Sequence, residues 1–79
     1  MPDAIKLQSL LANILREQRE AHSISQEELG FDAGLDRTTI NRYENGKLNL
    51  SIFALFSICE VLDVKPSKII TQIEKELYK

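Results

Sequence analysis

Two glycines, Gly30 and Gly34, lie four residues apart in the stretch QEELGFDAGLDRTTINRYE, between segments that otherwise favour helix. Glycine in a helix interior costs about 1 kcal/mol relative to alanine, so this close pair needs a structural reason. Gly34 suits a helix that ends in the left-handed conformation, which glycine adopts without a steric penalty. Gly30 lies one turn earlier and faces the incoming helix, where a side chain would push the two backbones apart. The pair therefore predicts two short helices joined at a steep angle.

Capping residues mark the limits of both helices. Ser25, followed three residues later by Glu28, is typical of a capping box at a helix start. Asp36 is a good N-cap for the next helix, and Asn45-Gly46 is a helix stop. We therefore expect helices at about residues 26–34 and 37–44.

Helical spacing of apolar residues recurs on both sides of this pair, and no segment shows strand-like alternation. We expect a first helix from about Ala4 to Ala21, a fourth after the N-cap Ser51, and a fifth from Pro66, which suits a first helical turn. The expected fold is all-α: a compact five-helix orthogonal bundle in one domain, residues 1–79. Helices four and five, at about 51–79, supply core and a dimerisation surface.

The composition narrows the classes of function. Cys59 is the only cysteine and His22 the only histidine among 79 residues, so we expect no disulfide, no metal and no cofactor. No Ser/His/Asp or Cys/His set and no Gly-rich loop after a strand is present, which argues against an enzyme. No apolar run approaches the ~20 residues of a membrane span, and the start of the chain, MPDAIKLQSLL, has an acid where a signal peptide would carry positive charge. We therefore expect a cytoplasmic protein. Cys59 is either a small buried hydrophobe on helix four or a redox-sensing thiol.

The order Gly30, Gly34, Ile40, Tyr43, with both caps, is that of a helix-turn-helix. A helical hairpin without DNA function would share only one or two of these features, and it remains the alternative. The segments SQEELG, AGLDRTTINRYENG and LSIFALFSICEVLDVKPSKI together resemble the lambda-repressor/Cro-like family, also called the xenobiotic-response-element type, over about three quarters of the chain. Two departures are Ser23, where the family often has glycine, and Gly30, where alanine is commoner.

The resemblance also implies a buried pair between the first and third helices, formed by Arg19 and Glu44. It implies, in addition, a small protein of the repressor or restriction–modification controller type. Such a protein acts on double-stranded DNA and resides at the nucleoid.

In a helix-turn-helix, the second helix enters the major groove and its solvent-facing residues reach base edges. Ile40 and Tyr43 are expected to point inward. The four outward candidates for base reading are Arg37, Thr38, Asn41 and Arg42. Arginine can bond guanine N7 and O6, asparagine can bond adenine N6 and N7, and the threonine methyl can touch a thymine methyl. The family resemblance points to the same positions.

Phosphate contacts position such a protein without reading sequence. Gln26 starts the first helix of the motif, and its backbone N–H lies at the positive end of that helix, where it can meet a phosphate oxygen. The further candidates, at the edges of the reading helix and beyond it, are Thr39, Asn45, Lys47, Asn49 and Ser51.

The charge balance bears on assembly. The net charge is −2, and residues 16–47 include five basic and seven acidic side chains, which predicts weak nonspecific DNA binding. Specific affinity then needs two half-sites at once, so we expect a homodimer on a palindromic operator. The interface candidates are Phe53, Phe56, Ile69, Ile73 and Leu77. The alternative is that these apolar residues fill the core of one chain.

Two classes of function follow. The first is a sequence-specific transcriptional regulator, either a small repressor or a controller protein. The second is a protein-binding adaptor or antitoxin that retains the fold, which the net charge favours and the reading-helix residues Arg37, Asn41 and Arg42 disfavour. Neither needs a membrane, and no small-molecule ligand is evident.

Overall fold

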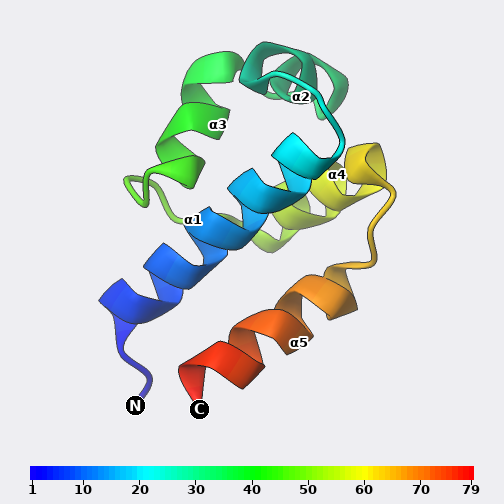
Figure 1. Ribbon diagram of the computed structural model, residues 1–79. Helices are drawn as coiled ribbons and strands as arrows, with labels where there is room; N and C mark the ends of the chain where they lie inside the picture. Colours follow the sequence, from blue (N-terminus) through cyan, green and yellow to red (C-terminus); the bar gives the residue numbers. More distant parts are fainter.

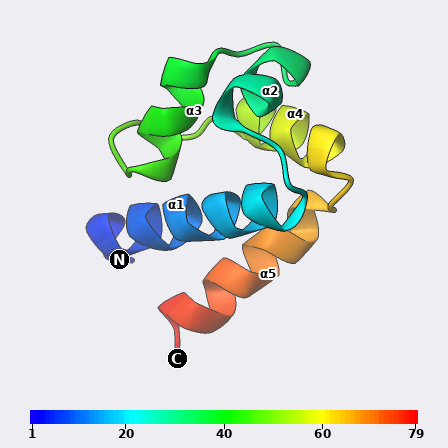
Figure 2. The ribbon, with the colours of Figure 1, turned by 45° about the horizontal axis from the view of Figure 1, so that its top comes forward.

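The computed structural model describes all 79 residues, which form five helices and no strand. The helices are α1 (Ala4–Ala21), α2 (Gln26–Asp32), α3 (Arg37–Glu44), α4 (Ile52–Leu62) and α5 (Pro66–Leu77). The long α1 crosses the middle of the molecule, with α2, α3 and α4 on one side and α5 on the other (Figure 1, Figure 2). This arrangement confirms the predicted all-α bundle of five helices. None of the helices combines the length and the apolar character that crossing a membrane requires.

The core gathers apolar side chains from all five helices. Its most deeply buried members, each with 2% or less of its surface exposed, are Leu29, Ile40, Ile58, Cys59, Leu62 and Ile69. Each large aliphatic side chain buried in this way contributes about 1.5–3 kcal/mol, which matters in a chain with so small a core. Burial raises the pKa of the Cys59 thiol, which disfavours the reactive thiolate and favours the interpretation of Cys59 as a buried hydrophobe.

The turn between α2 and α3 has the geometry that the two glycines predict. Gly34 has φ +73°, in the left-handed region. A Cβ added at Gly30 would lie 2.6 Å from the carbonyl carbon of Asp36 and 2.8 Å from its oxygen, so only glycine fits there without a shift. The Leu35 N–H donates to the Gly30 carbonyl at 2.7 Å and ties the turn together. The helix α2 ends at Asp32, two residues before Gly34.

Three N-caps expected from the sequence are formed. The Ser25 hydroxyl accepts a hydrogen bond from the Glu28 N–H at 3.0 Å. The Asp36 carboxylate accepts from the Thr39 N–H at 2.7 Å, and the Ser51 hydroxyl accepts from the Ala54 N–H at 3.0 Å. Each of these bonds satisfies a backbone N–H that the helix itself leaves without a partner.

The chain leaves α1 through a strained residue. Ser23 has φ +54°, a left-handed conformation that costs an L-residue roughly 1–2 kcal/mol. This is one of the two positions at which the sequence departs from the family pattern.

Candidate nucleic-acid interface

The short α3 has a buried face and a polar solvent face. Ile40 and Tyr43 are 1% and 9% exposed and lie in the core, as the sequence predicts. The four candidates for base reading are all exposed and share the solvent side of this helix: Arg37, Thr38, Asn41 and Arg42. The side chains of Arg37, Thr38 and Arg42 make no hydrogen bond or ion pair within the chain, so their donors are free for another molecule.

Both ends of α3 are held by local bonds. At the start, the bond from the Thr39 N–H lowers the pKa of the Asp36 carboxyl, and the Thr39 hydroxyl lowers it further. At the end, the Lys47 N–H donates to the Arg42 carbonyl at 2.9 Å, after a turn through Gly46 with φ +66°. The helix α3 is therefore short because its sequence caps it at Asp36 and stops it after Glu44.

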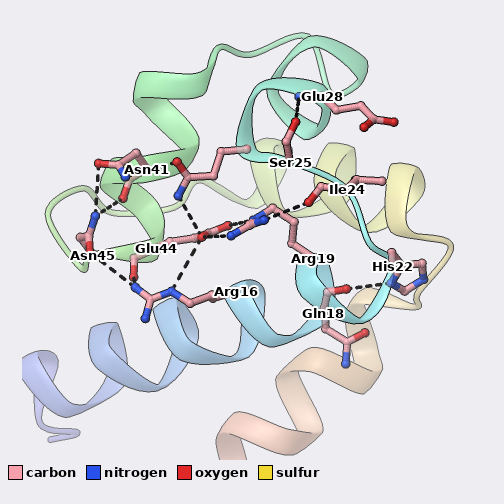
Figure 3. Close-up of polar contacts among 11 residues, drawn as sticks. Arg16, Gln18, Arg19, His22, Ile24, Ser25, Glu28, Asn41, Glu44 and Asn45 are labelled. Atoms are coloured by element: carbon pink, nitrogen blue, oxygen red, sulfur yellow. Dashed lines mark hydrogen bonds and ion pairs between the residues drawn. The ribbon is translucent and has the colours of Figure 1, made fainter.

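A buried carboxylate anchors α3 to α1. The side chain of Glu44 is 2% exposed and forms a bidentate contact with Arg19, at 2.7 Å from Nε and 3.0 Å from Nη2 (Figure 3). The hydrogen bond to Glu44 raises the pKa of Arg19 further above its ordinary value. Arg19 Nη1 also donates to the Ile24 carbonyl at 2.9 Å. The pair that the family resemblance implied is thus present, and it fixes the C-terminal end of α3.

Arg16 is a neighbour of this pair that the sequence analysis did not single out. Its Nη2 donates to the Glu44 carbonyl at 2.6 Å, and its Nε lies 3.8 Å from Glu44 Oε1. The available signal was its place three residues before Arg19, since residues at this spacing share a helix face.

The candidates for phosphate contact differ in whether they already have hydrogen-bond or ion-pair partners within the chain. Lys47 is exposed and forms no ion pair. The backbone N–H of Gln26 has no hydrogen-bond partner in the chain, but the side-chain amide of Gln26 is engaged by Glu44 and Asn41. Asn49 accepts from Gln8 Nε2 at 2.6 Å.

The remaining phosphate candidates serve helix ends or neighbours. The hydroxyl of Ser51 is used as the N-cap of α4, and Thr39 is half-buried at the start of α3. Asn45 is exposed, and its amide bonds both Asn41 and Arg16 (Figure 3). The roles of these residues toward phosphate stay predictions.

The candidates for dimerisation divide into two groups. Phe53 and Phe56 are 77% and 56% exposed on α4, an unusual exposure for phenylalanine in a lone small domain. Ile69 and Ile73 are 0% and 6% exposed, and Leu77 is half-buried. Both side chains lie in the core of one chain, where α5 packs on α1, and their contact with a partner stays a prediction.

The chain matches a known protein family and has relatives of known sequence. A family model described as Helix-turn-helix matches residues 15–69, a range that includes all of α2, α3 and α4. The chain is 30% identical over 76 residues to the control protein C.SmaI of Serratia marcescens, and the match covers 91% of this chain and 90% of that protein. This chain spans only 22% of a longer relative, an HTH-type transcriptional regulatory protein of Methanococcoides burtonii, at 35% identity.

Two solved structures resemble this chain in both fold and sequence. The restriction-modification controller protein C.AhdI from Aeromonas hydrophila matches with a TM-score of 0.76 and 34% identity, covering 78% of this chain and 90% of that one. The wild-type restriction-modification controller protein C.Esp1396I matches with a TM-score of 0.81 and 30% identity, covering 92% and 94%.

Proposed function

Since this chain belongs to the helix-turn-helix family of DNA-binding transcriptional regulators, we propose that it acts as a homodimer on a near-palindromic operator, in the manner of a restriction–modification controller. In this proposal α3 lies in the major groove and reads base edges. A regulator of this kind works in the cytoplasm, where the DNA is, and needs no catalytic chemistry.

The observation that carries the proposal is the free polar face of α3. Arg37, Thr38 and Arg42 are exposed and have no partner within the chain. A purely structural surface helix would gain from pairing its arginines with some of the acidic residues that this chain has in excess. Arg37 lies in the first turn of α3, where a side chain reaches deepest into a groove, and its fork of donors fits guanine O6 and N7.

The exposed aromatic residues of α4 support the dimer. Phe53 and Phe56 lie one turn apart, so they share a helix face, and covering them with a second copy buries two large apolar side chains per chain. For two copies of α3 to reach half-sites one DNA turn apart, the two-fold axis has to place them ~34 Å from each other. Ile70, 48% exposed, is the apolar residue that α5 can add to such an interface.

Selection of bound DNA from a random pool tests the proposal. We expect a near-palindromic motif whose half-sites are centred about one helical turn apart. Arg37→Ala should then lose preference at one base pair of each half-site, at a cost of about 1–3 kcal/mol. Lys68→Ala, which removes one positive charge from α5 on the far side of α1, is the matched control and should leave the motif unchanged.

Two results would count against this function. A pool that yields no enriched motif would favour the protein-binding adaptor, which keeps the fold and uses another surface. A motif without two-fold symmetry, bound by a chain that sediments as a monomer, would remove the dimer. Phe53→Glu tests the interface directly: it should leave the circular dichroism spectrum unchanged, because Phe53 is 77% exposed, and yield a monomer that binds its site weakly.

A further inference from the structure

Five side chains from α1, α2, α3 and the C-cap residue Asn45 form a closed ring of polar contacts beside α3. Arg16 Nη2 donates to Asn45 Oδ1 at 3.4 Å, and Asn45 Nδ2 donates to Asn41 Oδ1 at 3.2 Å. Asn41 Nδ2 donates to Gln26 Oε1 at 3.3 Å, and Gln26 Nε2 donates to Glu44 Oε1 at 3.1 Å. Arg16 Nε lies 3.8 Å from that same Glu44 oxygen, and this ion pair closes the ring (Figure 3).

The chemistry of Arg16 and Glu44 gives the hydrogen bonds of the ring a single direction. The guanidinium of Arg16 can only donate hydrogen bonds, and the carboxylate of Glu44 can only accept them. The three amides between them each accept on one side and donate on the other. Turning all three around would set an NH₂ group against the donor of Arg16 and a carbonyl oxygen against the carboxylate of Glu44. Neither of these contacts is a hydrogen bond, so polar groups beside the buried carboxylate would lose their partners.

This direction determines what Asn41 presents to solvent. Its Oδ1 has accepted one hydrogen bond and its Nδ2 has donated one, so one lone pair and one N–H remain. Adenine offers a matching donor and acceptor at N6 and N7 in the major groove, whereas guanine offers two acceptors, N7 and O6. A freely rotating amide could turn its NH₂ group toward guanine, and an amide held in place cannot. Restricting the amide therefore raises discrimination against the wrong base.

Arg16 closes the ring between Glu44 and Asn45. Its guanidinium is itself fixed by the 2.6 Å bond to the Glu44 carbonyl, so it presents a rigid donor to Asn45. We propose that Arg16 is a positioning residue for base specificity, which acts through Asn45 to hold the amide of Asn41 in the orientation that selects adenine. This inference rests on the proposed function, since it assigns a specificity to the same reading helix.

The test compares the motifs that variants select from a random DNA pool. The wild type should prefer adenine at one position of each half-site, and Asn41→Ala should lose that preference. Arg16→Met, which removes the donor and keeps a long side chain, should reduce the preference for adenine about threefold to tenfold at that position alone. Arg16→Lys should retain most of it, because an ammonium group also only donates. In the Asn41→Ala background, Arg16→Met should cause no further change there.

A second variant protects the test against a loss of fold. Asn45→Ala opens the ring at an exposed residue and leaves the contacts of Arg16 with Glu44 in place, so it should reproduce the loss seen with Arg16→Met. If Arg16→Met lowers the affinity equally at every position of the motif and adenine is still preferred, Arg16 only supports the fold or meets a phosphate. That result would overturn the inference. So would an Asn41→Ala motif identical to that of the wild type. A wild-type chain that selects no motif would overturn the proposed function along with it.

Discussion

Replacing Gly30 with alanine tests how closely α2 and α3 approach. The added Cβ would lie 2.6 Å from the Asp36 carbonyl carbon, 2.8 Å from its oxygen and 3.0 Å from the Arg37 nitrogen. All three are backbone atoms at the start of α3, so no side chain can rotate away to make room.

The expected loss follows from these distances. Ordinary van der Waals contact begins at 3.4 Å, so the backbone at Asp36 would have to move by about 0.8 Å. Overpacking of a tight contact costs about 1–3 kcal/mol, and a rigid backbone neighbour favours the upper end. Alanine recovers about 1 kcal/mol through its higher helix propensity. The net loss is about 2 kcal/mol, which lowers the melting temperature of a domain this small by about 8–16 °C.

Thermal melts followed by circular dichroism measure this loss, with Gly34→Ala as the matched control. Gly34 has φ +73° and nothing within 4 Å of its added Cβ, so alanine there adds strain of roughly 1–2 kcal/mol without moving α3. The two variants should therefore melt at similar temperatures, but only Gly30→Ala should weaken specific DNA binding of the folded protein. A Gly30→Ala melting temperature at or above that of the wild type would show that α2 and α3 separate without cost, and would refute the reasoning.

Three further predictions concern stability. Glu44→Gln keeps the shape of the side chain but leaves Arg19, whose side chain is 13% exposed, without its counter-charge. A urea titration should show that the free energy of unfolding falls by about 3–5 kcal/mol. An unchanged midpoint would contradict the anchoring role. Ser23→Gly relieves the strain of a left-handed residue at φ +54°. It should raise the free energy of unfolding by about 1 kcal/mol, and the melting temperature with it. An unchanged melting temperature would mean that the strain is offset elsewhere. The hydrogen bond from Thr39 holds the pKa of Asp36 below its ordinary value of 3.8, so Asp36 stabilises the fold above that pH and the stabilisation is lost as the pH falls further; Asp36→Asn should flatten this part of the acid profile.

Local chemistry explains why the helices could be predicted from the sequence. Each helix start depends on one side chain and the N–H groups within three residues of it, as at Ser25, Asp36 and Ser51. The α2–α3 turn likewise depends on Gly34, whose conformation is a property of that residue alone. Family resemblance then supplied the buried pair of Arg19 and Glu44, which no local pattern indicates.

Packing between distant helices could not be predicted in the same way. The ridge of Ile69, Ile73 and Leu77 has the spacing of an apolar face, but spacing cannot say whether α1 or a second chain covers that face. The ring through Arg16 is harder still, because it joins three helices and each member is an ordinary polar residue in its own segment. Such contacts become visible only once the crossing of α1 and α3 places the side chains within a few ångströms.

The structure also changes the meaning of the charge count. Of the five basic residues between positions 16 and 47, Arg16 and Arg19 are both engaged by Glu44. The cations left free for DNA are Arg37, Arg42 and Lys47. Each phosphate neutralised contributes about −0.9 to the slope of log K against log salt, so nonspecific binding should have a slope no steeper than about −2.7 per chain, or about −5.4 for a dimer. Titrations of random-sequence duplex between low and physiological salt would measure it. A dimer slope well beyond about −5.4 would require cations on another face, and would mean that α3 is not the main contact with the phosphate backbone.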